Sequence, residues 1–166
     1  MLDVVLFGEF RVRSEGSLLP GLRSPRTQAL LGYLVLHPGT PQPRQQIANV
    51  FWPDSTEAQA RTNLRRELHT LRVGLPDPDA VLAVDQTGVW WRDDGACRID
   101  VTAFTAAADQ ADAALEGGDA TGFADAAKSA IAVYGGDFLP ALYDDWVLAE
   151  RERLLRRCVR LLDGLI

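Results

Sequence analysis

Basic side chains are concentrated in one short stretch, QARTNLRRELHTLR at residues 59–72. They are Arg61, Arg65, Arg66, His69 and Arg72, set around leucines at helical spacing. Arginine makes paired hydrogen bonds to guanine and also binds phosphates, and asparagine and glutamine make paired hydrogen bonds to adenine. The stretch therefore has the residue types that reading of a DNA groove requires.

The charge of this stretch contrasts with that of the whole chain, which has 17 basic and 23 acidic residues and a formal net charge of −6. Residues 61–72 hold four arginines and one glutamate, a local charge of +3. Because salt screens exposed charges beyond about 10 Å, the local charge matters more for a phosphate-binding surface. Charge alone also fits a solvated helix face, with pairs from Arg61 to Asp54 or Glu57, so the surrounding elements must decide.

The hydropathy pattern predicts the elements that would position this stretch. Residues 2–13 are predicted to be strand, with a bulge or turn at Gly8. A helix follows from Pro25 to the HPGTP segment, a short helix covers 44–51, and a long helix runs to about Val73. The segment VLAVDQTGVWWR then predicts a β-hairpin. This order is that of a winged helix-turn-helix domain, and in that context DNA binding becomes the favoured explanation of the arginines.

The long helix is predicted to have an apolar stripe and a polar face. Its N-cap is Ser55, or Thr56 in a capping box shifted by one residue. At about 100° per residue the stripe consists of Leu64, Leu68, Leu71 and Leu75. The residues that project on the opposite side are Gln59, Thr62, Arg66, His69 and Thr70.

These positions predict two groups of DNA contacts. The predicted base contacts are Gln59, Thr62, Asn63 and Arg66. The predicted phosphate contacts are Arg61, Arg65, His69 and Arg72, with Arg26 and Arg44 at the starts of the first two helices. A rotation of the long helix by one residue would exchange its base contacts with its phosphate contacts. Arg26 and Arg44 can also be explained as solvated surface arginines.

The second half of the chain changes to alanine-rich helix from Ile99. Two antiparallel helices are predicted, each closed by a glycine pair, followed by a third helix from Trp146 to Ile166. Helix pairs with small residues at their crossings favour tetratricopeptide-like stacking. The predicted domains are thus 1–97, a winged helix-turn-helix, and 98–166, an all-α domain. Because the apolar LLDGLI has no polar cap, the second domain is expected to be truncated at its C-terminal end.

Other features exclude several classes of function. The chain has no G-x-x-x-x-G-K-[ST], H-E-x-x-H or G-x-S-x-G motif, so no enzyme activity, cofactor or metal is expected. The acidic pairs Asp93–Asp94 and 144–145 are sequence neighbours on turns, and Cys97 and Cys158 are predicted to be reduced structural thiols. No apolar run reaches a membrane span, and no secretion signal is present, so a cytoplasmic protein without a membrane partner is expected. Of the adjacent tryptophans, Trp90 is expected to pack inward.

Five segments carry a family pattern: VLFGEFRV, SPRTQALLGYLVLHPG, FWPDSTEAQARTNLRRELHTLR, IDVTAF and YGGDFLPALYDDWVLAERERL. They resemble the Streptomyces antibiotic regulatory protein family, whose members join a winged helix of the response-regulator type to a bacterial transcriptional activator domain. The resemblance implies a transcriptional activator that binds double-stranded DNA at repeated promoter sites. It also implies that the helical domain helps homodimer formation or contact with RNA polymerase.

A second hypothesis remains open at this point. Larger members of the family carry ATPase and repeat domains downstream. The winged helix would then be a protein-interaction platform at the N-terminus of a signalling ATPase-type regulator, with the acidic helical domain as its partner surface.

Overall fold

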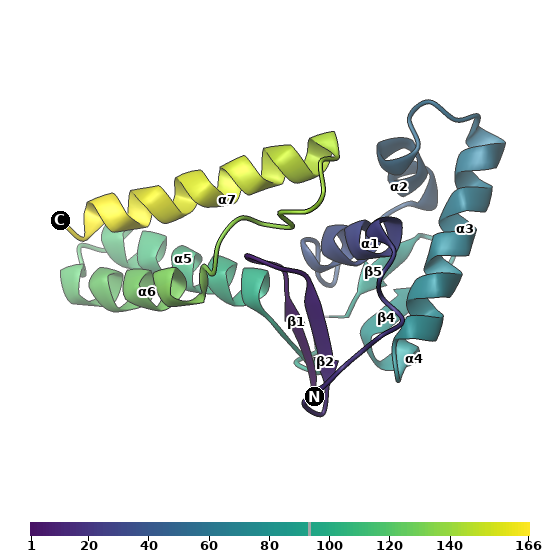
Figure 1. Cartoon of the computed structure of the whole chain (residues 1–166). Coiled ribbons are helices and arrows are strands. Elements are labelled where there is room, and N and C mark those ends of the chain that lie inside the picture. The colour runs from purple at the N-terminus through teal and green to yellow at the C-terminus, as the bar shows by residue number, and fades with distance from the viewer. Residues whose placement is uncertain (93) are drawn as a thin grey trace. The chain divides into compact units, whose positions relative to one another are not determined.

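The computed structural model describes residues 1–92 and 94–166 (Figure 1), and Asp93, of the expected acidic pair, lies outside the described residues. The strands are β1 (Leu2–Val5), β2 (Arg11–Ser14), β3 (Ser17–Leu18), β4 (Leu82–Val84), β5 (Val89–Trp91) and β6 (Cys97–Ile99). The helices are α1 (Pro25–Val35), α2 (Arg44–Phe51), α3 (Glu57–Gly74), α4 (Pro78–Val81), α5 (Asp100–Glu116), α6 (Ala120–Val133) and α7 (Asp145–Gly164). The protein is therefore α+β, and the predicted helices and the predicted hairpin are confirmed.

The chain forms two compact units that do not follow the sequence strictly. Unit 1 consists of residues 1–3 and 11–97, and unit 2 consists of residues 4–10 and 98–166. The predicted strand over 2–13 is two strands, because the chain leaves β1 at Leu6 and passes Gly8 at a φ of 80° before β2 begins. The backbone therefore crosses between the units within its first eleven residues.

Unit 1 begins with a tight hairpin. Strands β2 and β3 pair antiparallel, with Arg13 opposite Leu18 and Ser14 opposite Ser17. The two residues of the turn, Glu15 and Gly16, have φ angles of 48° and 81°. Two successive positive φ angles are those of a type I′ turn, whose twist matches that of the paired strands.

Helix α1 is the buried centre of unit 1. Pro25 occupies its first turn, and every residue from Ala29 to Val35 is buried. The Thr27 hydroxyl, fully buried, donates to Glu67 Oε2 of α3 at 2.9 Å. Burial of so many side chains on one helix explains why α1 has only a weakly amphipathic sequence, since a central helix has no solvent face.

The hairpin of β4 and β5 is paired in the register Leu82↔Trp91, Ala83↔Trp90 and Val84↔Val89. Trp91 is 1% exposed and Trp90 is half-buried, so the expectation that Trp90 would pack inward was wrong. The outer edge of β5 pairs with the loop before α2, where Gln42 and Val89 exchange backbone hydrogen bonds of 2.9 and 3.0 Å. Val89 and Trp91 lie on the same face of β5 and are both buried, and β5 packs against α1.

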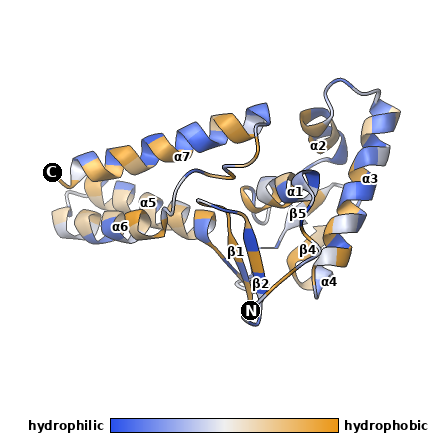
Figure 2. Ribbon diagram, viewed as in Figure 1, coloured by the Kyte–Doolittle hydropathy of each residue, from blue (hydrophilic) through white to orange (hydrophobic). Residues whose placement is uncertain are grey.

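Unit 2 is built on the close approach of α5 and α6. The buried residues of α5 are Val101, Phe104, Ala108 and Ala111, and those of α6 are Phe123, Ala127 and Ala130. Alanines at the crossing let two helix backbones come close, as the small-residue pattern predicted. Figure 2 shows apolar and polar bands alternating along α7, whose buried residues are Val147, Leu154, Cys158 and Leu161.

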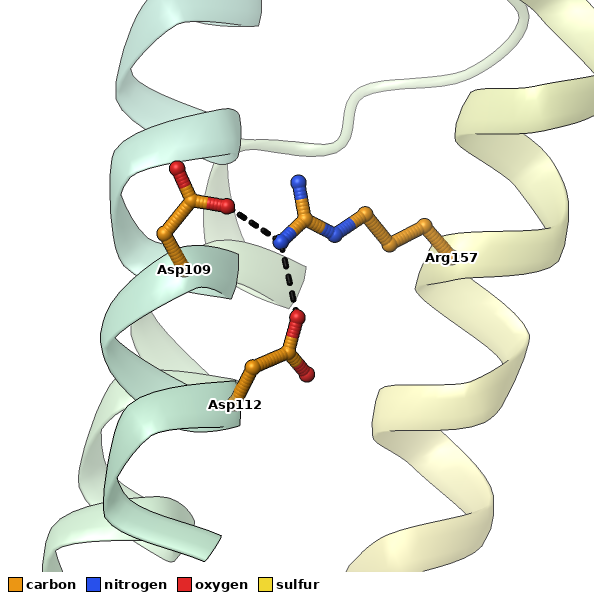
Figure 3. Close-up of polar contacts among 3 residues, drawn as sticks. All are labelled: Asp109, Asp112 and Arg157. Atoms are coloured by element: carbon orange, nitrogen blue, oxygen red, sulfur yellow. Dashed lines mark hydrogen bonds and ion pairs between the residues drawn. The ribbon is translucent and has the colours of Figure 1, made fainter. Parts of the chain in front are cut away.

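An arginine from α7 links that helix to α5 (Figure 3). One terminal nitrogen of Arg157 pairs with Asp109 and also contacts Asp112 Oδ2 at 2.8 Å. The Arg157 side chain is only 12% exposed, so the two carboxylates compensate its guanidinium charge for the loss of hydrating water. The two aspartates lie three residues apart on α5, which places them on the same side of that helix.

The N-terminal segment is held in unit 2 by a single side chain, Asp100 at the start of α5. Its carboxylate accepts hydrogen bonds from the backbone N–H groups of Leu6 (3.0 Å), Phe7 (2.9 Å) and Val101 (2.7 Å). Burial raises the pKa of Asp100 above its usual value of 3.8, although these N–H groups favour the charged form. The N-terminal segment therefore depends on a hydrogen-bond acceptor, the Asp100 carboxylate, that is itself partly buried.

Aromatic packing and two backbone hydrogen bonds complete the attachment of the N-terminal segment. The Phe7 ring packs against Phe104 and Tyr134, with centroids 5.6 and 4.8 Å apart. Gly8 N donates to the carbonyl of Asp137 at 2.9 Å, and Leu139 N donates to the carbonyl of Leu6 at 2.8 Å. The segment thus lies between α5 and the connector that leads to α7.

We expect Asp100→Asn to lower the free energy of unfolding by about 1–3 kcal/mol, because an amide NH2 would face backbone donors that lose their acceptor. Equilibrium denaturation would measure the loss. Asp125→Asn, which neutralises an exposed carboxylate on α6, should change stability by less than about 0.5 kcal/mol. Equal stability of the two variants would contradict the role assigned to Asp100.

Candidate nucleic-acid interface

Helix α3 carries most of the predicted contact residues, and a capped first turn holds its start. The N-cap is Thr56, whose hydroxyl oxygen accepts from Gln59 N at 3.2 Å, so the shifted capping position was right and Ser55 was not. Ala60, Leu64 and Leu71 are buried against unit 1, while Leu68 is half-buried. This stripe fixes the rotation of α3 and so decides which side chains face solvent.

The predicted base contacts lie on the outer face of α3. Gln59, Thr62 and Arg66 are exposed, and Asn63 is half-buried. Gln59 Nε2 donates to Asn63 Oδ1 at 2.9 Å, and the Thr62 hydroxyl donates to the carbonyl of Ala58 at 3.0 Å. Within the described residues Arg66 has no hydrogen-bonding side-chain partner, so its guanidinium is available to a ligand.

The predicted phosphate contacts of α3 line a groove between this helix and the β4–β5 hairpin. The groove has a volume of about 620 Å³. Its polar lining consists of Arg44, Arg61, Arg65, His69, Arg72, Asp79 and Arg92. Its apolar lining consists of Leu64, Leu68, Leu82, Ala83 and Val84. With five arginines and one aspartate, and His69 neutral, the lining has a net charge of +4 in a chain whose net charge is −6.

Three of these basic residues have side chains without a hydrogen bond or ion pair to any described residue. They are Arg61, Arg65 and His69, all on α3. A cluster of like charges without counter-ions is electrostatically unfavourable in the free protein, and a bound polyanion would relieve it. The groove therefore has the properties of an anion-binding surface.

The other predicted phosphate contacts already have protein partners. Arg72 pairs with Asp79 of α4 at 2.6 Å, and Arg44 donates to the carbonyl of Asp85 in the hairpin turn at 2.8 Å. Arg26 lies outside the groove, with its guanidinium 5.6 Å from the centroid of the Phe51 ring. These three arginines stabilise unit 1 as well as contributing charge.

The turn that Arg44 contacts is itself organised by Asp85. The Asp85 carboxylate accepts from the hydroxyl and the backbone N–H of Thr87, at 2.6 and 2.7 Å, and from Gly88 N at 3.2 Å. These hydrogen bonds, foremost that of the Thr87 hydroxyl, lower the pKa of Asp85. Gly88 has a φ of 155°, and a Cβ there would lie 2.2 Å from the carbonyl oxygen of Gln42, so only glycine fits.

The structure thus separates the two predicted groups. Arg61, Arg65, His69 and Arg72 share the groove with Arg44, whereas Gln59, Thr62, Asn63 and Arg66 lie outside it on the adjoining face of α3. Sequence reasoning missed Arg92, whose Nε donates to the carbonyl of Asp79 at 3.0 Å, and Asp79 itself. Helical periodicity cannot find these two, because they lie beyond α3 and come to the groove only when the hairpin folds back.

Other kinds of site were sought in the described part of the chain. Among residues 1–92 and 94–166, no three His, Cys, Asp or Glu side chains are placed to hold a metal ion. In the same residues, no helix has both the length and the apolar character that crossing a bilayer requires.

Two comparisons with known proteins bear on this arrangement. Residues 99–166 match the family described as bacterial transcriptional activator domain. The solved structure of EmbR from Mycobacterium tuberculosis, in complex with a low-affinity phosphopeptide, is similar over 96% of this chain, with a TM-score of 0.76 and 23% sequence identity. The second half of the chain therefore resembles a bacterial transcriptional activator domain, and the fold of the whole chain resembles that of EmbR. The predicted family resemblance is confirmed.

The extent of the match limits what carries over to this chain. The chain covers 43% of the EmbR chain, and at 23% identity the likeness concerns the fold. The phosphopeptide belongs to the EmbR structure. No curated protein is similar enough in sequence to match this chain.

The cap of α3 yields a paired test. We expect Thr56→Ala to cost about 1 kcal/mol of unfolding free energy, because the first turn of α3 loses its side-chain acceptor. Ser55→Ala, one residue earlier and exposed, should change stability by less than about 0.5 kcal/mol. Denaturant unfolding of both variants measures the difference, and a larger loss for Ser55→Ala would show that Ser55 is the cap.

Proposed function

We propose that the protein is a sequence-specific DNA-binding transcriptional activator. In this proposal residues 1–97 are a winged helix-turn-helix domain of the response-regulator type, and residues 98–166 are a tetratricopeptide-like activator domain. The single observation that carries DNA binding is the groove of net charge +4, lined by two arginines and one histidine whose side chains have no partner among the described residues, beside an exposed polar face of the same helix. The match to a bacterial transcriptional activator domain supports the activator role.

Helix α3 would enter the major groove of double-stranded DNA. At about 1.5 Å per residue its 18 residues extend for about 27 Å, and the major groove of about 12 Å width accepts a helix. The side chains that would contact base edges are Gln59, Thr62, Asn63 and Arg66. Amide groups suit adenine and a guanidinium suits guanine, so the exposed face offers readers for both purines.

The sugar-phosphate backbone of one strand would lie along the groove between α3 and the hairpin. Arg61, Arg65 and His69 are the first candidates for phosphate contact, because they have no partner among the described residues. Arg26, Arg44 and Arg72 are further candidates whose existing protein contacts would have to be shared. The hairpin would act as the wing.

The activator role extends the proposal to other partners. We propose that the protein binds repeated promoter sites, that two copies associate there as a homodimer, and that the helical domain contacts RNA polymerase. The alternative is a protein-interaction platform within a larger ATPase-type regulator. That alternative requires no affinity for DNA, so a DNA-binding measurement distinguishes the activator from the interaction platform.

We expect the protein to select a repeated motif from a random duplex pool at low and at moderate salt. Affinity should fall as salt rises, because each phosphate contact releases counter-ions. Sequencing of the bound duplexes gives the motif and its half-site spacing. Absence of binding to any duplex at low salt would contradict DNA binding and favour the interaction platform.

Two neighbouring arginines test the division of α3 into two surfaces. Arg65→Ala should weaken binding to all duplexes alike and reduce the slope of log affinity against log salt by about 0.9, because one phosphate contact is lost. Arg66→Ala should relax the preference at one motif position, because a base reader is lost. Arg160→Ala, on the exposed side of α7, is the matched control and should change neither. If Arg65→Ala and Arg66→Ala produce the same loss on every sequence, the assignment of the two surfaces is wrong.

A further inference from the structure

The hydrogen bond between Gln59 and Asn63 joins two residues one helical turn apart on the outer face of α3. Gln59 Nε2 donates to Asn63 Oδ1 at 2.9 Å. Gln59 is the third residue after the N-cap Thr56, where a glutamine side chain ordinarily reaches back to the N-cap backbone in a capping box. Here the side chain extends forward to Asn63 instead, so it contributes to the polar face.

This bond fixes the orientation of the Asn63 amide. An asparagine amide has two ends that differ little in shape, an oxygen that accepts and a nitrogen that donates. In this pairing Gln59 is the donor, the oxygen of Asn63 faces it, and Nδ2 is the other end. The oxygen keeps a second lone pair, so the amide still offers one acceptor and two donors to a ligand.

That arrangement matches the major-groove edge of adenine, which presents the N7 acceptor beside the N6 amino donor. We propose that Asn63 reads an adenine through these two atoms, and that Gln59 is the positioning residue that holds the amide in the required orientation. The proposal rests on the proposed function, since it names the base that the same face of α3 recognises.

Neighbouring side chains are consistent with this assignment. The Thr62 hydroxyl proton is already donated to the carbonyl of Ala58, so Thr62 does not compete for the Asn63 oxygen. Arg66 follows Asn63 by three residues, about 4.5 Å along the helix axis, which is close to one base-pair step. The motif should therefore contain an adenine close to the base pair that Arg66 contacts.

The decisive variant is Gln59→Glu. A glutamate carboxylate accepts but cannot donate, so it removes the bond to the Asn63 oxygen and attracts Nδ2 instead. Oδ1 would then point toward adenine N7, and two acceptors would face each other. The helix should remain folded, because a negative charge in the first turn of a helix is favourable.

A second glutamine–asparagine pair supplies the matched control. On α2, Gln45 Nε2 donates to Asn49 Oδ1 at 2.8 Å, with the same spacing of four residues. Gln45→Glu introduces the same charge into the same local arrangement on a helix without predicted base contacts. Any general weakening by the added carboxylate should therefore affect both variants.

The experiment is selection from a random duplex pool by the whole chain and by the variants Gln59→Glu, Gln45→Glu and Asn63→Ala. We expect the unaltered chain to prefer adenine at one motif position by about tenfold or more. Asn63→Ala and Gln59→Glu should both abolish that preference and keep the preference at the position that Arg66 contacts, and Gln45→Glu should keep both.

The outcomes distinguish this inference from the function on which it rests. If Gln59→Glu keeps the adenine preference that Asn63→Ala loses, Gln59 does not position the reader. If Asn63→Ala keeps every preference, Asn63 is not the reader, although DNA binding stands. If the unaltered chain selects no motif, the proposed function fails, and the reading of adenine fails with it.

Discussion

The structure of unit 2 depends on the attachment of the N-terminal segment to Asp100. Three backbone N–H groups, two of them from Leu6 and Phe7, share one partly buried carboxylate at the start of α5. These hydrogen bonds hold the segment so that the Phe7 ring packs against Phe104 and Tyr134 in the aromatic core of the unit. The matched activator family begins at Ile99, yet the compact unit also needs residues 4–10, which are separated from it in sequence by residues 11–97 of unit 1. A domain boundary placed by sequence alone therefore separates residues that share a core.

In unit 1 the rotation of α3 has the comparable role. Three buried side chains, Ala60, Leu64 and Leu71, place the helix so that its basic and its amide-bearing surfaces face different directions. The groove beside the hairpin concentrates a charge of +4 in an acidic protein, because α3, the start of α2 and the end of β5 each contribute arginine to it. A polyanion would meet this local charge first, since the remaining charges of the protein are screened over about 10 Å.

The polar contacts of α3 divide its residues into fixed and available groups. Arg72 and Arg44 are tied to α4 and to the hairpin turn, so they preserve the shape of the groove. Arg61, Arg65 and His69 line that groove without partners in the described chain. On the outer face, Gln59 and Asn63 already hold each other, which reduces the conformational entropy that a base contact would cost. The interface is in this sense partly organised before any ligand binds.

The sequence by itself determined α1, α2, α3, the hairpin and the helices of unit 2, because their apolar periods and their Pro and Gly signals act locally. It also predicted Arg61, Arg65, His69 and Arg72 as one group of phosphate contacts, although it placed His69 with Gln59, Thr62 and Arg66 opposite the leucine stripe. Tertiary structure decided which tryptophan of 90 and 91 is buried, since burial of one face of β5 depends on packing against distant segments such as α1. It alone brought Asp79 and Arg92 to the groove and Val4–Phe10 into unit 2. Those placements come from contacts between distant segments, whose pairing no local pattern encodes.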